Sequence, residues 1–209
     1  MIDVGSSWGR WSFAAASIGY RPIGVDPSLG AILAAKRIAA ARGCRFEGIV
    51  ADARYLPLRS GSIDAAFSYS VIQHFSKKDA RRAFAEISRV TRQDGIVRIQ
   101  MASAIGMRSF WHLMRRRLKE PANFDVRYWL PSELLCTFKA AFGVGSLEVD
   151  CYFGLGFQST DKALYGPLGR ALLVASERLR KISSVFHPLK YVADSLYLVG
   201  NNTHPPDQS

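Results

Sequence analysis

The stretch Asp3-Val4-Gly5-Ser6-Ser7-Trp8-Gly9 joins a short apolar run, residues 1–4, to a helical pattern over about residues 9–18. An acidic residue at a strand end, followed by a glycine, is typical of a tight turn at which the backbone approaches a ligand closely. Gly9 permits a second close approach where the helix begins, and free N–H groups at a helix start bind polar or anionic ligands. The stretch therefore predicts a ligand-binding turn between the first strand and the first helix.

Two further carboxylates follow at the ends of the next two predicted strands. In Gly24-Val25-Asp26-Pro27, the acid lies about 20 residues past the turn, the spacing expected of a ribose-binding residue. Asp52 ends the third strand in Val50-Ala51-Asp52-Ala53. Because ligands of open α/β sheets bind at the carboxyl edge of the strands, the three loops are expected to form one site. The competing interpretation is that these Gly and Asp residues are turn formers and helix caps alone.

Strand and helix patterns alternate along the chain, which favours an α/β fold with a doubly wound, mostly parallel sheet of seven strands. The final strands, over 146–153 and 194–200, are predicted to pair in antiparallel fashion. In the helix over 77–91, Ala80, Ala83, Phe84, Ile87 and Val90 form one apolar face, and Ser76 with Asp79 predicts its N-terminal cap. The other predicted strands cover 1–4, 21–26, 45–51, 63–69 and 96–102, and the other helices cover 9–18, 29–42, 105–119, 131–142 and 168–182.

The composition is that of a globular protein. The chain has 209 residues, 48% hydrophobic and 22% charged, which indicates one domain with a sizeable core. We expect no transmembrane helix and no signal peptide, because no long apolar run is present. The three cysteines are widely spaced and suggest a reducing compartment, so a cytoplasmic location without a metal site is expected. The formal net charge of +11 fits a solvated basic surface, nucleic acid, an anionic membrane or an anionic substrate.

Residues 2–102 resemble the class I S-adenosylmethionine-dependent methyltransferases of the type 11 group. The turn and the acids Asp26 and Asp52 match that family, as do Leu56-Pro57-Leu58 with the stretch Ser62–Phe67, and the loop Ser68–Phe75. The resemblance implies the methyltransferase form of the Rossmann-like fold, S-adenosylmethionine as the cofactor, and methyl transfer to an acceptor. It also implies the following cofactor-binding residues: Asp3, Gly5, Ser6, Gly9, Asp26, Pro27, Asp52, Ala53 and Ser68.

Two features depart from the family. Ser7 stands where the middle glycine of the turn is usual, and because serine is small we expect cofactor binding to survive. The first strand begins only two residues before Asp3, whereas the family has a longer strand preceded by a helix. We therefore expect the N-terminal helix and part of the first strand to be missing from the chain as written.

His74, on the loop after the fourth strand, is the best candidate for a general base, because an ordinary imidazole accepts a proton near neutral pH. The alternative is that His74 only packs within the loop. Tyr69 and Gln73 are candidates to orient the substrate.

The family resemblance divides the domain into a cofactor-binding half, residues 1–103, an acceptor-side half, residues 104–200, and a disordered tail, residues 201–209. The helix over 105–119 has an apolar stripe and the cluster Arg115–Arg117. Three interpretations of it stay open: core packing with a solvated face, a lid over the acceptor, or an interfacial helix on anionic lipid. The aromatic stretches 124–129 and 152–157 either line a pocket or, as we favour, belong to the core.

The leading functional hypothesis is methyl transfer to a small molecule of lipid-like, quinone-like or glycan-precursor type. A cofactor-binding module without catalysis is the alternative. A nucleic-acid methyltransferase is disfavoured because the loop after the fourth strand lacks an Asn/Asp-Pro-Pro-aromatic motif, so no nucleic-acid partner is expected. A nicotinamide-dependent oxidoreductase is disfavoured because the turn lacks Gly-x-Gly-x-x-Gly spacing. The sequence does not indicate an oligomeric state.

Overall fold

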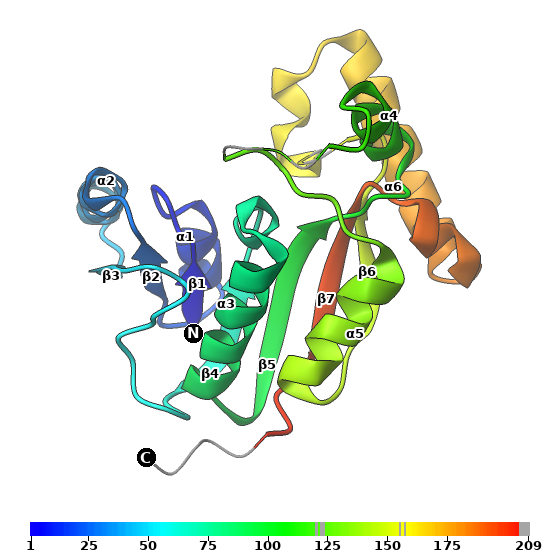
Figure 1. Cartoon of the computed structure of the whole chain (residues 1–209). Helices are drawn as coiled ribbons and strands as arrows, with labels where there is room; N and C mark the ends of the chain where they lie inside the picture. The colour runs from blue at the N-terminus through cyan, green and yellow to red at the C-terminus, as the bar shows by residue number, and fades with distance from the viewer. Residues whose placement is uncertain (120, 122–123, 155, 157, 205–209) are drawn as a thin grey trace.

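The computed structural model describes residues 1–119, 121, 124–154, 156 and 158–204, in which helices flank a central sheet (Figure 1). Within this part of the chain the sheet has seven strands: β1 (Ile2–Val4), β2 (Ile23–Asp26), β3 (Glu47–Val50), β4 (Ile63–Ser68), β5 (Thr91–Ala102), β6 (Ser146–Cys151) and β7 (Ser195–Asn201). The α-helices are α1 (Arg10–Ser17), α2 (Leu29–Ala41), α3 (Lys77–Val90), α4 (Met107–Arg115), α5 (Pro131–Phe142) and α6 (Pro167–Ser183). Three short 3-10 helices are η1 (Ile72–His74), η2 (Ser159–Leu164) and η3 (His187–Val192).

The strand order is β3-β2-β1-β4-β5-β7-β6. Neighbouring strands run parallel except where β7 pairs antiparallel with β5 and with β6. From β1 the chain crosses to β2 on one side and later places β4 on the other side of β1. The loops after β1 and β4 therefore diverge at the carboxyl edge, which is where doubly wound sheets bind their ligands. The predicted sheet, including its antiparallel last strand, is confirmed.

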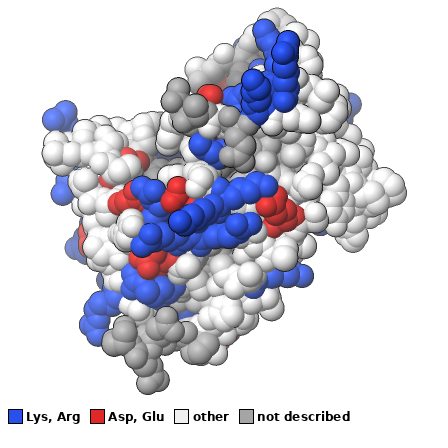
Figure 2. Space-filling model, in the orientation of Figure 1, with Lys and Arg blue, Asp and Glu red and all other residues white. Residues whose placement is uncertain are grey.

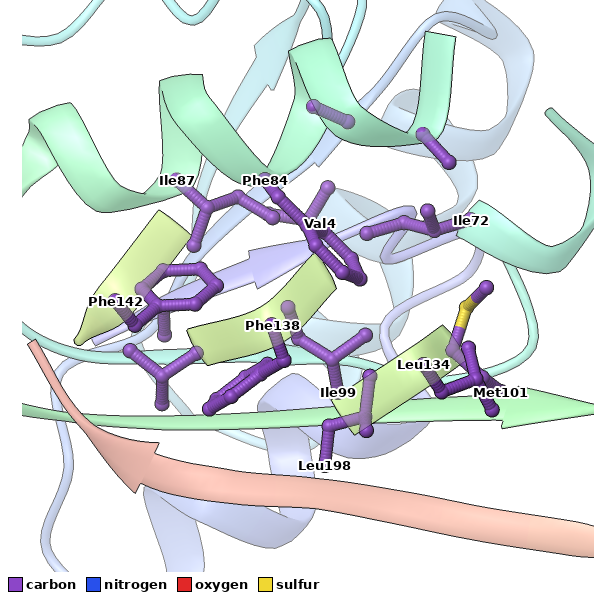
Figure 3. Close-up of a cluster of buried hydrophobic side chains, with 14 of the residues drawn as sticks. Val4, Ile72, Phe84, Ile87, Ile99, Met101, Leu134, Phe138, Phe142 and Leu198 are labelled. Atoms are coloured by element: carbon purple, nitrogen blue, oxygen red, sulfur yellow. The ribbon is translucent and has the colours of Figure 1, made fainter. Parts of the chain in front are cut away.

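The main core lies between one face of the sheet and the helices α3 and α5 (Figure 3). Phe84 and Ile87 of α3 are buried against this face, as the apolar pattern of residues 77–91 predicts. The Phe84 ring lies 6.2 Å from that of Phe138 and 6.0 Å from that of Phe142, so α3 and α5 share one aromatic cluster. Ser76 caps α3 as predicted, because its Oγ accepts a hydrogen bond from the Asp79 N–H at 3.1 Å.

A smaller apolar cluster joins α1 and α2 through Phe13, Ala35 and Ala39. This cluster fixes the start of α1, because Gly9, its N-terminal cap, lies directly over Phe13. A Cβ atom on Gly9 would come within 2.7 Å of the Phe13 ring, and Gly9 has φ +89°. Both observations explain the second glycine of the turn after β1.

The predicted boundaries need correction at two places in the second half of the sheet. Strand β5 begins at Thr91 and not at residue 96, because Thr91 pairs with Ile63 before an irregularity in the pairing of β4 with β5. The tail predicted to be disordered from Asn201 is ordered at its start. Asn201 ends β7, and the buried Asn202 donates hydrogen bonds to the carbonyls of Ser88 and Thr91 at 2.9 and 2.7 Å. Residues 205–209 of that tail lie outside the described residues.

Helix α4 is shorter than predicted, and its apolar stripe does not belong to the core. The helix ends at Arg115, and Arg117 and Leu118 follow in the left-handed conformation with φ 51° and 59°. Phe110, Trp111 and Met114 are about half exposed, so the interpretation of this helix as core packing is wrong. Across the described residues, no helix combines the length and apolar character needed to cross a membrane.

Candidate active site

The turn after β1 is held against β2 by backbone hydrogen bonds. The N–H groups of Gly5 and Ser6 both donate to the Val25 carbonyl, at 2.7 and 3.1 Å. Gly5 has φ +78°, and a Cβ atom there would come within 2.1 Å of the Val71 side chain. A residue with a side chain is therefore excluded at Gly5 by both conformation and space. Ser7 has φ 47°, the left-handed region that glycine adopts freely, which explains why glycine is usual at this point.

Asp26, at the tip of β2, is tied to the turn and to the start of α2. One carboxylate oxygen accepts the Ser7 N–H at 2.9 Å, and the other accepts the Ser28 N–H at 2.9 Å. Each carboxylate oxygen has two lone pairs, so each has capacity for a further donor. The carboxylate is thus held in place by the backbone and can still accept hydrogen bonds from ribose hydroxyls.

Asp52 follows β3, and the neighbouring Arg54 already engages its carboxylate. The sequence did not predict this ion pair. The Arg54 guanidinium donates to both carboxylate oxygens, at 3.0 and 2.7 Å, and also pairs with Asp79 at 3.2 Å. Hydrogen bonding from Arg54 is the main cause that lowers the pKa of Asp52. Asp52 is therefore ionised at neutral pH, and it has less free acceptor capacity than Asp26.

The three loops meet in a cavity of about 370 Å³ at the carboxyl edge of the sheet. This volume lies within the range of small-molecule sites, about 300–1,000 Å³. Five predicted cofactor-binding residues line it, which confirms that the strand-end loops converge. The described wall consists of Gly5, Ser7, Val25, Asp26, Pro27, Ala51, Asp52, Ala53, Tyr69, Ser70, Val71, Phe75 and Phe124.

The other predicted cofactor-binding residues lie behind this wall. Asp3 is 1% exposed and accepts a hydrogen bond from the Ser12 hydroxyl at 2.7 Å, and burial raises its pKa to about 6. Ser68 is buried and donates to the Val4 carbonyl at 3.0 Å, so it joins β4 to β1. Gly9 and Ser6 shape the turn from the inside. In the structure these four residues support the cavity and do not line it.

Tyr69 lines the cavity and belongs to a buried polar network. Its hydroxyl donates to Asp150 of β6 at 3.1 Å, and the Ser195 hydroxyl donates to the same oxygen at 2.7 Å. Gln100 continues the network, because its amide donates to Ser195 at 2.6 Å and its carbonyl oxygen accepts the Ser70 N–H at 2.7 Å. Burial is the main cause that raises the pKa values of both Tyr69 and Asp150. The network thus fixes the left-handed Ser70, φ 60°, at the cavity wall.

Gln73 belongs to the same network and not to the cavity wall. It is 1% exposed, its side-chain amide donates to the Ser70 hydroxyl at 2.8 Å, and its backbone carbonyl accepts the Arg127 backbone N–H at 2.8 Å. A direct substrate contact by Gln73, which the sequence analysis suggested, does not fit this placement. The side chain supports the loop on which Tyr69 and Ser70 lie.

His74 lies next to the cavity and not among its lining residues. Its ring stacks on that of Phe124, with centroids 4.3 Å apart and planes at 10°, and Phe124 itself lines the cavity. The His74 Nδ1 atom is buried and has no hydrogen-bond partner among the described residues. Burial is the main cause that lowers the pKa of His74 below its ordinary 6.5, so the imidazole is neutral at pH 7.

Apolar side chains complete the wall, and Val71, Phe75 and Phe124 were not among the predicted site residues. Val71 and Phe75 flank the predicted residues of the loop after β4, and Phe124 is 74% exposed although its stretch was assigned to the core. In the same stretch, Trp129 is 1% exposed, as the core assignment predicts. In the stretch 152–157, Tyr152 is buried and Phe153 packs against the core, as the core assignment predicts, and Leu155 and Phe157 lie outside the described residues. An aromatic-rich sequence gives no signal that separates wall from core.

Residues 1–95 match the family model described as "Methyltransferase domain". Residues 1–95 therefore form a methyltransferase domain. The family resemblance of the sequence is thereby confirmed, and S-adenosylmethionine is its cofactor.

Relatives of this methyltransferase agree in fold but differ in substrate. YcgJ from Bacillus subtilis superposes with a TM-score of 0.65 at 19% identity, over 97% of this chain and 91% of its own. A phosphoethanolamine N-methyltransferase from Haemonchus contortus, solved with S-adenosyl-L-methionine, gives 0.62 at 19% identity over 98% of this chain and 48% of its own. At such identities the similarity shows the fold alone. The mouse tRNA (carboxymethyluridine(34)-5-O)-methyltransferase ALKBH8 is 42% identical over 52 residues, which cover 24% of this chain and 8% of the mouse protein.

The cavity wall fits this cofactor by its donor and acceptor groups. A ribose needs acceptors for two hydroxyl groups, which Asp26 provides, and the apolar Val71 and Phe75 suit a purine. When bound, the cofactor supplies an electrophilic methyl group on a sulfonium. The wall residues would hold and orient it, and Tyr69 and Phe124 line the side of the cavity next to the loop after β4.

Proposed function

We propose that the chain transfers a methyl group from S-adenosylmethionine to a small-molecule acceptor that enters beside Phe124. The observation that supports this most is the composition of the cavity. Its wall combines the three strand-end loops of residues 1–53 with Tyr69 and with Phe124 from the second half of the chain. The proposed division of labour is that residues 1–103 bind the cofactor and residues 104–200 contribute acceptor contacts.

His74 is the proposed general base. A neutral imidazole is the form that accepts a proton, and the lowered pKa keeps His74 in this form at pH 7. Its stacking on Phe124 holds the ring beside the cavity. Rate enhancement otherwise comes from positioning, by holding the acceptor atom at roughly 3–3.5 Å from the methyl carbon in line with the breaking bond.

An RNA acceptor is the second candidate, and two observations favour it. The first is the 52-residue similarity to the mouse tRNA methyltransferase. The second is a band of Lys and Arg across α3 and its surroundings, which acidic groups border on several sides (Figure 2). Such a surface attracts phosphates irrespective of sequence, so it supports binding of a nucleic acid more than a particular acceptor base.

Calorimetric titration with S-adenosylhomocysteine tests the cofactor site directly. We expect binding by the chain and no binding of NADH. Asp26→Ala removes hydrogen bonds to a charged acceptor worth about 1.5–3 kcal/mol each, so affinity is expected to fall by roughly 10- to 100-fold. Asp64→Ala is the matched control, because Asp64 is an exposed acid at the opposite end of β4 that pairs with Arg92. Equal affinity of the two variants would contradict the ribose assignment.

Radiolabelling then distinguishes a small-molecule acceptor from an RNA acceptor. Radiolabelled methyl from S-adenosylmethionine is offered with a cell metabolite extract, a lipid extract and total tRNA, each in a separate reaction. Label in a small molecule of either extract supports the first proposal, and label in tRNA supports the second. Binding of S-adenosylhomocysteine without labelling of any fraction would support the alternative of a binding module without catalysis.

A further inference from the structure

Helix α4 turns its apolar side toward solvent. Phe110, Trp111 and Met114 are 55%, 53% and 52% exposed, and Met107 is 65% exposed. These positions repeat every three or four residues, so they form one continuous stripe along the helix. A stripe of this kind normally faces the core, as it does in α3.

The side of α4 that faces the protein is polar. Ser109 is 2% exposed, and its N–H donates to the buried Asp194 at 2.8 Å. Directly after the helix end, Arg116 donates to the Val126 carbonyl at 3.1 Å and pairs with Asp125 at 3.5 Å. These polar contacts fix the rotation of the helix, and the apolar stripe is held outward by them.

The charged side chains of α4 and of the residues next to it in the sequence are positive. Residues 104–119 contain Arg108, Arg115, Arg116, Arg117 and Lys119 and no acidic residue. On the helix, Arg108 and Arg115 lie one above the other along one flank of the stripe, and the Arg115 guanidinium lies 5.0 Å from the Trp111 ring. Figure 2 shows Lys and Arg gathered over the α4 region, at the top of the view.

We propose that α4 docks the chain on an anionic lipid bilayer, with its apolar stripe at the boundary of headgroups and acyl chains. Amphipathic helices that lie in this interface combine a Trp- and Phe-containing face with flanking Lys and Arg, the combination that α4 presents. The arginines would contact lipid phosphates, and the absence of acidic residues over 104–119 removes the repulsion that an anionic surface would otherwise exert. A partner protein would need a groove with acidic rims, whereas a bilayer provides both features over its whole surface.

Vesicle sedimentation tests the proposal without any need for cofactor or acceptor. The whole chain is mixed with vesicles of phosphatidylcholine alone, or of phosphatidylcholine with phosphatidylglycerol. We expect binding to the anionic vesicles only. Trp111→Ser combined with Met114→Ser is expected to weaken binding roughly tenfold or more, because two apolar side chains no longer enter the interface. The matched control is Ile18→Ser with Leu33→Ser, which changes two exposed apolar residues at α1 and α2.

Charge is tested separately. Arg108→Gln and Arg115→Gln should each weaken binding about fivefold on anionic vesicles. Lys36→Gln with Arg37→Gln, on α2, is the control for a general effect of net charge. Trp111→Phe should retain sedimentation but lose most of the fluorescence quenching by brominated lipids, which places this side chain in the bilayer. Circular dichroism of each variant verifies that it is folded.

Three results would overturn the proposal. One is equal binding by the Trp111→Ser and Met114→Ser variant and by its Ile18→Ser and Leu33→Ser control, and another is no preference for anionic vesicles. The third is a dimer, detected by analytical ultracentrifugation and broken by the Trp111→Ser and Met114→Ser changes, in a chain that binds no vesicles. That last result would assign the stripe to a second copy of the chain.

Discussion

Helices α3 and α4 have similar sequence patterns and opposite environments. Both carry an apolar stripe at helical spacing and several arginines, and both follow directly from a loop at the carboxyl edge of the sheet. In α3 the stripe is buried against the sheet and α5, and the cations face solvent. In α4 the stripe faces solvent, and polar groups such as Ser109 are buried. Periodicity therefore predicts that a stripe exists, and the surrounding elements decide what covers it.

The largest effect is expected where the two regions meet. His74 precedes α3, Phe124 follows α4, and their rings stack beside the cavity. His74→Gln should lower kcat by about 10²- to 10⁴-fold if this imidazole is the general base. In the unchanged chain, kcat should be constant around neutral pH and fall only in acid, below the ordinary 6.5, because burial lowers the pKa of His74.

The measurement for His74 is release of S-adenosylhomocysteine with the accepted substrate across a pH series. His112→Gln, on α4 and outside the cavity wall, is the control and should leave kcat unchanged. A similar kcat for His74→Gln and the control would return His74 to a packing role. That outcome would also mean that the proposed general base does not lie where the two regions meet.

Truncation in the α3 stripe should affect stability strongly. Phe84→Ala removes a ring that is 1% exposed and packed on Phe138 and Phe142, so the free energy of unfolding should fall by about 3–5 kcal/mol. Urea denaturation measured by circular dichroism gives this value. A loss under about 1 kcal/mol would mean that the site collapses without a cavity, and the contrast with α4 would weaken.

The contribution of one buried carboxyl group, that of Asp3, to the free energy of unfolding should depend on pH. Burial raises the pKa of Asp3 from 3.8 to about 6. The folded chain therefore holds a proton that the unfolded chain has lost, and stability should fall as the pH rises from about 4 to about 6, by roughly 3 kcal/mol in all. Asp3→Asn should remove this dependence, whereas Phe84→Ala should keep it. Parallel urea denaturation of the three proteins at several pH values measures it, and the same pH profile for the unchanged chain and for Asp3→Asn would contradict the raised pKa.

The smallest effect is expected in the α4 stripe. Phe110→Ala should change the free energy of unfolding by no more than about 0.5 kcal/mol, because the side chain has little burial to lose. The same urea experiment as for Phe84→Ala makes the comparison direct. A loss as large as that of Phe84→Ala would show that the α4 stripe is covered when the chain is free in solution.

Much of this protein follows from its sequence because the signals are local. The turn from Asp3 to Gly9 needs glycine where φ is positive, the strand tips place Asp26 and Asp52 at one edge, and the α3 stripe has a helical period. These features predict the doubly wound sheet and the convergence of the three loops. The match of residues 1–95 to a methyltransferase domain agrees with them.

The tertiary structure alone decided three other features. It paired Asp52 with Arg54, it placed Gln73 in a buried network with Gln100 and Asp150, and it turned the α4 stripe outward. Each depends on residues that are distant in sequence or on a choice between several partners within reach. A sequence pattern specifies which groups need a partner. Which partner they obtain is a difference between competing contacts, and that difference exists only once the chain is packed.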